Sequence, residues 1–158
     1  MHSRIVINTG PLITLARIDA LDLPGRLPLE FICPSEVRTE LDEGLRAGHP
    51  DVRPDWLRTV SLNTPLSPLA AFTLDSGESA VIQLALEQKI AWVCIDEWKG
   101  RRAALAAGLR VTGVLGLLGQ AKKHGIVSAV RPFIQKAHAA GIRYDAVLVA
   151  RFLDAVGE

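Results

Sequence analysis

The segment Ile90-Ala91-Trp92-Val93-Cys94-Ile95-Asp96 decides the fold class, because an unbroken apolar run here ends in a carboxylate. Such a run, bounded by polar residues, is typical of a strand buried on both faces of a parallel sheet. A strong helical pattern runs from Asp75 to about Gln88 and leads directly into it. This helix and strand form one unit of an α/β protein, with an acid at the strand's carboxyl end.

The same alternation continues on both sides of this unit. We expect strands at 4–8, 29–33, 56–62, 90–95 and 109–112, and helices at about 9–18, 34–44, 75–88, 98–107, 113–124, 128–140 and 145–156. Alternating strands and helices predict a three-layer αβα fold with a central parallel sheet of about four to five strands. The length of 158 residues suits a single domain over 1–158.

Composition narrows the class of protein. No apolar run approaches the roughly 20 residues of a membrane span, and the first residues lack the pattern of a signal peptide. We therefore expect a cytoplasmic protein without a membrane partner. Cys33 and Cys94 lie in apolar strand segments and are expected in the core. Two cysteines and four scattered histidines give no zinc-site spacing.

Charge is distributed unevenly along the chain. Residues 98–143 hold nine Lys or Arg and no Asp or Glu, whereas residues 1–97 hold eight Lys or Arg against fourteen Asp or Glu. An acidic part that binds a cation beside a basic part that attracts a polyanion is a plausible nuclease layout. The alternative is that the basic residues are ordinary solvated helix faces.

Polar side chains follow two of the predicted strands. Asn8 ends the first strand and Asp96 ends the fourth, while Glu40 and Glu78 lie on helices that follow strands or loops. The carboxyl ends of parallel strands meet at one edge of a sheet, so these groups can converge there. Carboxylate and amide oxygens are the ligands that Mg²⁺ or Mn²⁺ prefers, so we expect a cation site.

Each acid also has a structural alternative. Asp96 could cap the helix that begins near Trp98, and Glu78 stands three residues after Asp75, at the spacing of a capping box. Glu40 could be a solvated helix carboxylate. Of the tryptophans, we expect Trp92 in the core, and Trp56 and Trp98 either pack or stack nucleobases.

Five motifs in series resemble PIN-domain proteins. They are Val6-Ile7-Asn8-Thr9-Gly10-Pro11-Leu12-Ile13, Cys33-Pro34-Ser35-Glu36-Val37-Arg38-Thr39-Glu40-Leu41, the helix from Leu74 to Ala85, Ile95-Asp96-Glu97-Trp98-Lys99-Gly100-Arg101-Arg102-Ala103, and Val111-Thr112-Gly113-Val114-Leu115-Gly116. The third of these is similar to the corresponding helix of a VapC-like toxin ribonuclease subgroup. The resemblance covers nearly the whole chain.

This resemblance implies a metal-dependent endoribonuclease, often the toxin of a toxin–antitoxin pair and often a homodimer. It favours Asn8, Glu40, Glu78 and Asp96 as catalytic and metal-binding residues for Mg²⁺ or Mn²⁺. The bound ion would hold the scissile phosphate and activate a water molecule. The expected partners are RNA and an antitoxin protein.

Asn8 departs from the family pattern, which usually has Asp at this position. An amide can donate a carbonyl oxygen to a metal but brings no negative charge. The alternative function is therefore a weakly active or inactive PIN-like module that binds RNA or a protein partner. A Rossmann-type enzyme is disfavoured because no glycine-rich phosphate loop follows the first strand.

Five residues are candidates for binding RNA. Lys99, Arg101 and Arg102 follow Asp96 closely and can pair with the phosphate backbone. Thr112 precedes a predicted helix, whose free N–H groups attract anions. Thr9 can bind a phosphate or cap its own helix.

Overall fold

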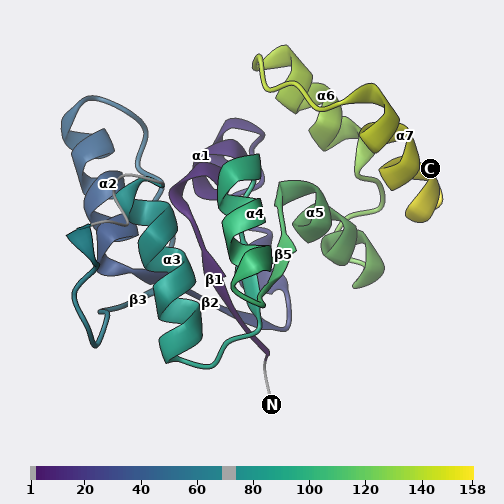
Figure 1. Ribbon diagram of the computed structural model, residues 1–158. Helices are drawn as coiled ribbons and strands as arrows, with labels where there is room; N and C mark the ends of the chain where they lie inside the picture. The colour runs from purple at the N-terminus through teal and green to yellow at the C-terminus, as the bar shows by residue number, and fades with distance from the viewer. Residues whose placement is uncertain (1–2, 69–73) are drawn as a thin grey trace.

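The computed structural model describes residues 3–68 and 74–158. Its centre is a parallel sheet of five strands in the order β3-β2-β1-β4-β5 (Figure 1). The strands are β1 (Ser3–Ile7), β2 (Leu29–Pro34), β3 (Leu57–Val60), β4 (Trp92–Cys94) and β5 (Arg110–Thr112). The predicted α/β class with a parallel central sheet is confirmed.

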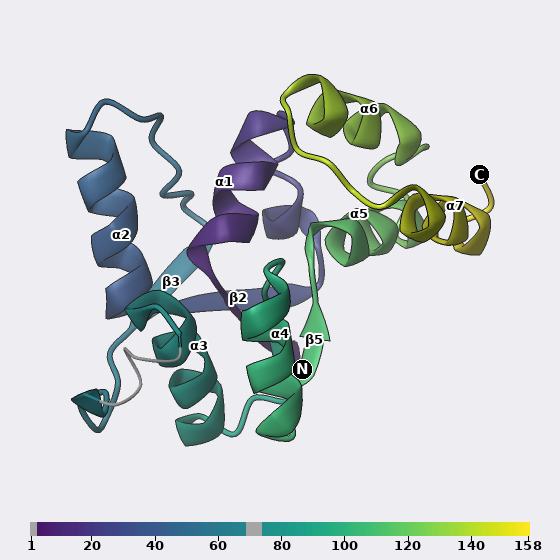
Figure 2. The same cartoon turned by 45° about the horizontal axis from the view of Figure 1, so that its top comes forward.

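Helices flank both faces of this sheet. They are α1 (Thr9–Arg17), α2 (Ser35–Arg46), α3 (Ser76–Glu87), α4 (Trp98–Ala106), α5 (Val114–Lys123), α6 (Arg131–Ala139) and α7 (Ala146–Ala155), with a short 3₁₀ turn at Pro24–Arg26. In Figure 2, α3 and α4 lie together on one side of the sheet, and α1 and α5 on the other. Right-handed crossovers explain this division, since the chain moves from β1 toward β3 and then from β4 toward β5.

The strand order reverses between β1 and β4, which are neighbours in the sheet. In open α/β sheets, ligands bind beyond the carboxyl ends of the strands at such a reversal. Asn8 follows β1 there, and its main-chain N–H donates to the carbonyl oxygen of Cys94 at 3.1 Å. The fold thus places the residues after β1 and β4 at the location where a site is expected.

The strands supply the core. Ile5, Val6 and Ile7 of β1 are buried, as are Cys33 and Cys94, which confirms the prediction for both cysteines. None of the helices in the described ranges is long and apolar enough to cross a membrane.

Two local predictions were wrong. Trp92 is 39% exposed, because it opens β4 at the sheet's amino edge, where the Arg110 guanidinium lies 5.8 Å from the ring centroid. Gly44 does not end its helix, since α2 continues to Arg46. A single glycine inside a helix costs only about 1 kcal/mol, and the buried residues Val37 and Leu41 hold α2 against the core.

Candidate active site

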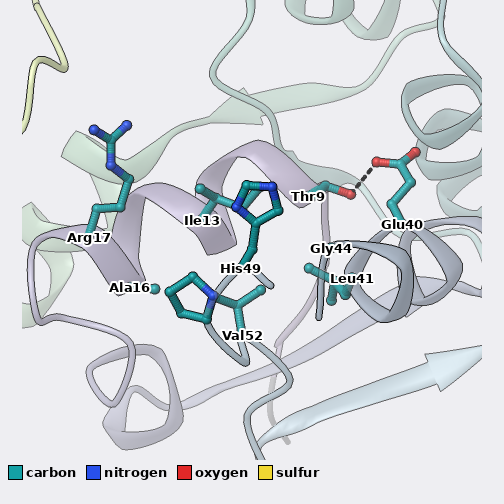
Figure 3. A pocket seen from close by; sticks show the side chains of 10 residues that line it. Thr9, Ile13, Ala16, Arg17, Glu40, Leu41, Gly44, His49 and Val52 are labelled. Carbon is teal, nitrogen blue, oxygen red and sulfur yellow. Dashed lines mark hydrogen bonds between the residues drawn. The ribbon is translucent and has the colours of Figure 1, made fainter. Parts of the chain in front are cut away.

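Glu40 is held at the carboxyl edge by groups from two other helices. The hydroxyl group of Thr9, the first residue of α1, donates to Oε2 of Glu40 at 2.7 Å (Figure 3). The main-chain N–H of Gly77, at the start of α3, also donates to this carboxylate. A Cβ atom at Gly77 would lie 2.1 Å from Glu40 Oε1, so the glycine makes room for the carboxylate.

Glu78 lies in the first turn of α3 and is only 4% exposed. Its main-chain N–H donates to Oδ1 of Asp75 at 2.7 Å, so Asp75 caps the helix as the capping-box spacing indicates. The Glu78 carboxyl group is hydrogen-bonded to Glu97. A Cβ atom at Gly100 would come within 3.3 Å of Glu78 Cδ, so this glycine also makes room for a carboxyl group.

Glu40, Asp75, Glu78 and Glu97 interact electrostatically, and we call these four residues the carboxylate cluster. Burial, followed by the charges and hydrogen bond of the other three members, raises the pKa of Glu78 to about 7. Burial is also the main reason that the pKa of Glu40 is raised. Over residues 3–68 and 74–158, no ion pair joins a Lys, Arg or His to the cluster. The cluster therefore has unbalanced negative charge whenever its members are ionised.

Asn8 is buried, with 7% exposure, between the last residue of β1 and the first residue of α1. Its side chain does not cap α1, and its Oδ1 atom has no hydrogen-bond partner within the described part of the chain. A buried acceptor without a partner is costly unless another group satisfies it. Asn8 thus offers a free oxygen atom beside Thr9, which binds the cluster through Glu40.

Asp96 is directed elsewhere. Its Oδ1 atom accepts the main-chain N–H of Val114 at 3.0 Å, so it caps α5 rather than the helix that begins at Trp98. Burial raises its pKa, while this hydrogen bond and the Arg101 charge act in the opposite direction. Asp96 lines a separate cavity of about 580 Å³ together with Arg101 and Tyr144. The structure therefore brings Glu40 and Glu78 together but turns Asp96 away from them.

Glu97 is the residue that the sequence interpretation missed. The pair Asp96-Glu97 follows β4 after one residue, Ile95, and both acids are candidates by position. The two acids have different partners: Oδ1 of Asp96 accepts the Val114 N–H, whereas Glu97 interacts with Glu78. Glu97 is therefore the acid of this pair that joins the cluster.

The predicted RNA-binding residues occupy different environments. Thr9 is engaged with Glu40, and Arg101 is turned inward, with Nη1 donating to the carbonyl oxygen of Ile95 at 2.7 Å. Thr112 lies against Gly116, where a Cβ atom would approach its hydroxyl oxygen to 2.0 Å. Lys99 and Arg102 are exposed on α4 and remain accessible to a polyanion.

An apolar pocket of about 530 Å³ opens beside Thr9 and Glu40. Ile13 of α1 and Leu41 of α2 line its walls, and the loop that carries His49 and Val52 closes it (Figure 3). This loop joins α2 to β3.

The donor atoms at this edge suit a hard divalent cation. They are carboxylate oxygens and the free amide oxygen of Asn8, which an ion would satisfy. As they stand, no three acidic, histidine or cysteine side chains of the described ranges are placed so as to hold an ion. Binding at Glu40, Glu78 and Glu97 therefore requires side-chain movement, whereas Asp96 is already committed to α5.

The parallel fold defines an α/β protein, and carboxylate and amide oxygens gather at the carboxyl edge of its sheet. A family model described as PIN domain (DUF3368) matches residues 4–158, and the chain belongs to this family. PIN domains are generally nucleases and commonly bind divalent metals. Comparison with curated proteins and with solved structures gave no match.

Proposed function

We propose that the protein is a metal-dependent endoribonuclease that hydrolyses RNA phosphodiester bonds. The observation that carries this proposal is that Glu40, Glu78 and Glu97 gather at the carboxyl edge of the sheet in a PIN domain, while no ion pair within residues 3–68 and 74–158 joins them to a Lys, Arg or His. Clustered carboxylates repel one another by several kcal/mol, about 4 kcal/mol for a pair 4 Å apart at an effective dielectric of 20. A site that keeps this repulsion is suited to capturing a cation.

The ligands would be Glu40, Glu78 and Glu97, with Oδ1 of Asn8 as a neutral fourth donor. When bound, Mg²⁺ or Mn²⁺ polarises the scissile phosphate, lowers the pKa of the attacking water and stabilises the leaving oxygen. Thr9 orients Glu40 through its 2.7 Å hydrogen bond. Asp75 accepts the Glu78 main-chain N–H and so caps α3, which fixes the first helical turn that carries the Glu78 side chain.

The adjacent acids Asp96 and Glu97 provide the sharpest test. Glu97→Gln removes a carboxylate from the cluster, whereas Asp96→Asn keeps an oxygen atom that can accept the Val114 N–H. We expect Glu97→Gln, like Glu40→Gln and Glu78→Gln, to lower the rate of RNA cleavage at least about 100-fold, as loss of a transition-state electrostatic contact does. Asp96→Asn and the exposed control Asp154→Asn on α7 should retain most of the activity. The opposite result for positions 96 and 97 would refute this choice of ligands.

The assay is cleavage of a labelled RNA with Mg²⁺, Mn²⁺ or EDTA. Cleavage that requires the divalent ion and is lost in Glu97→Gln supports the proposal. If purified wild-type protein cleaves no RNA with either metal, the nuclease proposal fails.

Asn8 favours a second candidate function, a PIN-like module that binds RNA or a protein partner with little or no catalysis. Its amide oxygen lacks the charge of a carboxylate, and this lowers metal affinity. Salt-sensitive RNA binding by wild type without metal-dependent cleavage would support this function.

The roles as toxin, antitoxin partner and homodimer rest on resemblance alone. We propose them as the biological setting of the nuclease. Growth arrest on expression would test the toxin role. Rescue of growth by co-expression of the protein encoded next to it would test the antitoxin partner, and a dimeric mass in solution would test the homodimer.

A further inference from the structure

The outer face of α4 begins next to the carboxylate cluster and carries an exposed tryptophan. Trp98 follows Glu97 directly, and Trp98, Arg102 and Leu105 stand at positions i, i+4 and i+7, which share one face of a helix. Trp98 and Leu105 are each 59% exposed. The guanidinium group of Arg102 lies 5.2 Å from the centroid of the Trp98 ring.

The other two tryptophans have different environments. Trp56 packs edge to face against Phe31, with ring centroids 5.2 Å apart, and its indole N–H donates to the carbonyl oxygen of Leu21. Trp92 stands at the amino end of β4, at the opposite edge of the sheet from the cluster. Trp98 is therefore the tryptophan that presents a broad apolar surface to solvent beside the candidate active site.

Beyond Glu97, the charge along α4 suits a polyanion. Lys99 and Arg102 are exposed on the same helix, and no Asp or Glu occurs from residue 98 to residue 143. An exposed aromatic ring next to a guanidinium group can stack on a nucleobase while the cation lies near the backbone phosphate. Stacking of this kind requires an unpaired base.

We propose that Trp98 and Arg102 form a platform on which an unpaired base of single-stranded RNA stacks, close to the scissile bond. The proposal rests on the proposed function for its placement of the scissile phosphate at the cluster. It adds the residues that receive the base, Trp98 and Arg102. A duplex keeps its bases paired and cannot present one to the ring.

The test measures binding of a fluorescein-labelled single-stranded oligoribonucleotide in EDTA, so that no cleavage occurs. Removing one base–aromatic stack weakens binding about fivefold to a hundredfold, and we expect this loss for Trp98→Ala and a much smaller loss for Trp98→Phe. Leu105→Ala is a matched control with equal exposure on the same helix face. Trp92→Ala is a second control, because it removes a tryptophan–arginine pair from the other edge of the sheet.

A second readout follows Trp98 itself. In a Trp56→Phe, Trp92→Phe variant, Trp98 is the sole tryptophan, and stacking of a base on its ring should quench its fluorescence. The same strand annealed to its complement should bind more weakly and cause little quenching.

Equal RNA affinity of wild type and Trp98→Ala would overturn the proposal. A loss of affinity in Leu105→Ala and Trp92→Ala as large as that in Trp98→Ala would also overturn it. A change in self-association on Trp98→Ala, without a change in RNA binding, would identify the α4 face as a protein contact and also overturn it. The nuclease proposal is tested independently by Glu97→Gln. If Glu97→Gln abolishes cleavage and Trp98→Ala binds RNA normally, the protein is a nuclease and the stacking platform is rejected. If Trp98→Ala weakens RNA binding but the wild-type protein never cleaves RNA, the platform is supported and the nuclease is rejected.

Discussion

Replacing Glu78 with glutamine should stabilise the protein at pH 8 in EDTA and leave its stability nearly unchanged at pH 5. Glu78 is almost fully buried, and its pKa is raised to about 7 from an ordinary value of 4.5 by burial and by Asp75, Glu97 and Glu40. Glutamine has nearly the same shape and no charge. At pH 8 it removes the repulsion that ionised Glu78 meets in the cluster.

The sign and size follow from proton linkage. A carboxyl group whose pKa is raised by folding binds its proton more tightly in the folded chain, so stability falls as the pH rises from about 4.5 to about 7. Each pH unit across this window costs at most about 1.4 kcal/mol. Because Glu97 is exposed and its charge is screened by water, we expect a total of about 2 kcal/mol, or about 4–8 °C in melting temperature for a chain of this size.

The assay is thermal unfolding from pH 5 to pH 8 in EDTA at low salt. The control is Asp154→Asn, which removes an exposed carboxylate from α7, away from the cluster, and should shift the melting temperature by the same small amount at every pH from 5 to 8. If Glu78→Gln lowers the melting temperature equally at pH 5 and pH 8, the Glu78 carboxylate is not destabilised in the folded chain. The cluster would then lack the charge repulsion that a bound cation is expected to relieve.

Three further changes test neighbouring parts of the structure. Asn8→Asp should tighten Mn²⁺ binding at least about tenfold, or about 1.4 kcal/mol, because it adds a charged ligand. An unchanged Mn²⁺ affinity, measured by calorimetry, would place residue 8 outside the ion site. Gly77→Ala should lower RNA cleavage about tenfold or more without unfolding the chain. The new Cβ atom would lie 2.1 Å from Glu40 Oε1 and so displace that flexible side chain. Full activity would show that the position of Glu40 is unimportant. Glu158→Gln should lower the melting temperature at pH 7, because the carboxylate accepts the Val130 N–H at 2.8 Å and pairs with Lys122, which lowers its pKa. This effect should shrink as the pH falls below 4.5, since stability from a lowered carboxyl pKa is lost on protonation, and a pH-independent effect would contradict the ionic contribution.

Much of the fold was predictable because it depends on local pattern. Apolar runs such as 90–95 have the composition of strands buried on both faces, and helical patterns between them require parallel crossovers. The exposure of Trp92 was not predictable from its apolar neighbours, since it depends on the residue's position at the sheet's amino edge. The continuation of α2 beyond Gly44 likewise depends on tertiary packing, which overrides the propensity of one residue.

The candidate site was predictable in part for a related reason. Strand order and helix starts bring Glu40 and Glu78 to one edge, and the spacing of Asp75 and Glu78 indicated the cap that is observed. Whether Asp96 or Glu97 enters the cluster depends on backbone direction in the short connection between β4 and α4. Sequence pattern carries little information on that direction, whereas the hydrogen bonds to Val114 and Glu78 assign each acid.

The carboxylate cluster offers a physical reason for an amide rather than a carboxylate at position 8. Glu78 already retains a proton up to about pH 7, so its surroundings tolerate little more negative charge. A carboxylate at position 8 would strengthen a metal site but would add repulsion whenever no cation is bound. On the proposed function, Asn8 gives up metal affinity in exchange for stability, and Asn8→Asp should destabilise the protein in EDTA at pH 8. If both residues share one site, Glu78→Gln should reduce that penalty, because neighbouring charges couple whereas distant ones add independently.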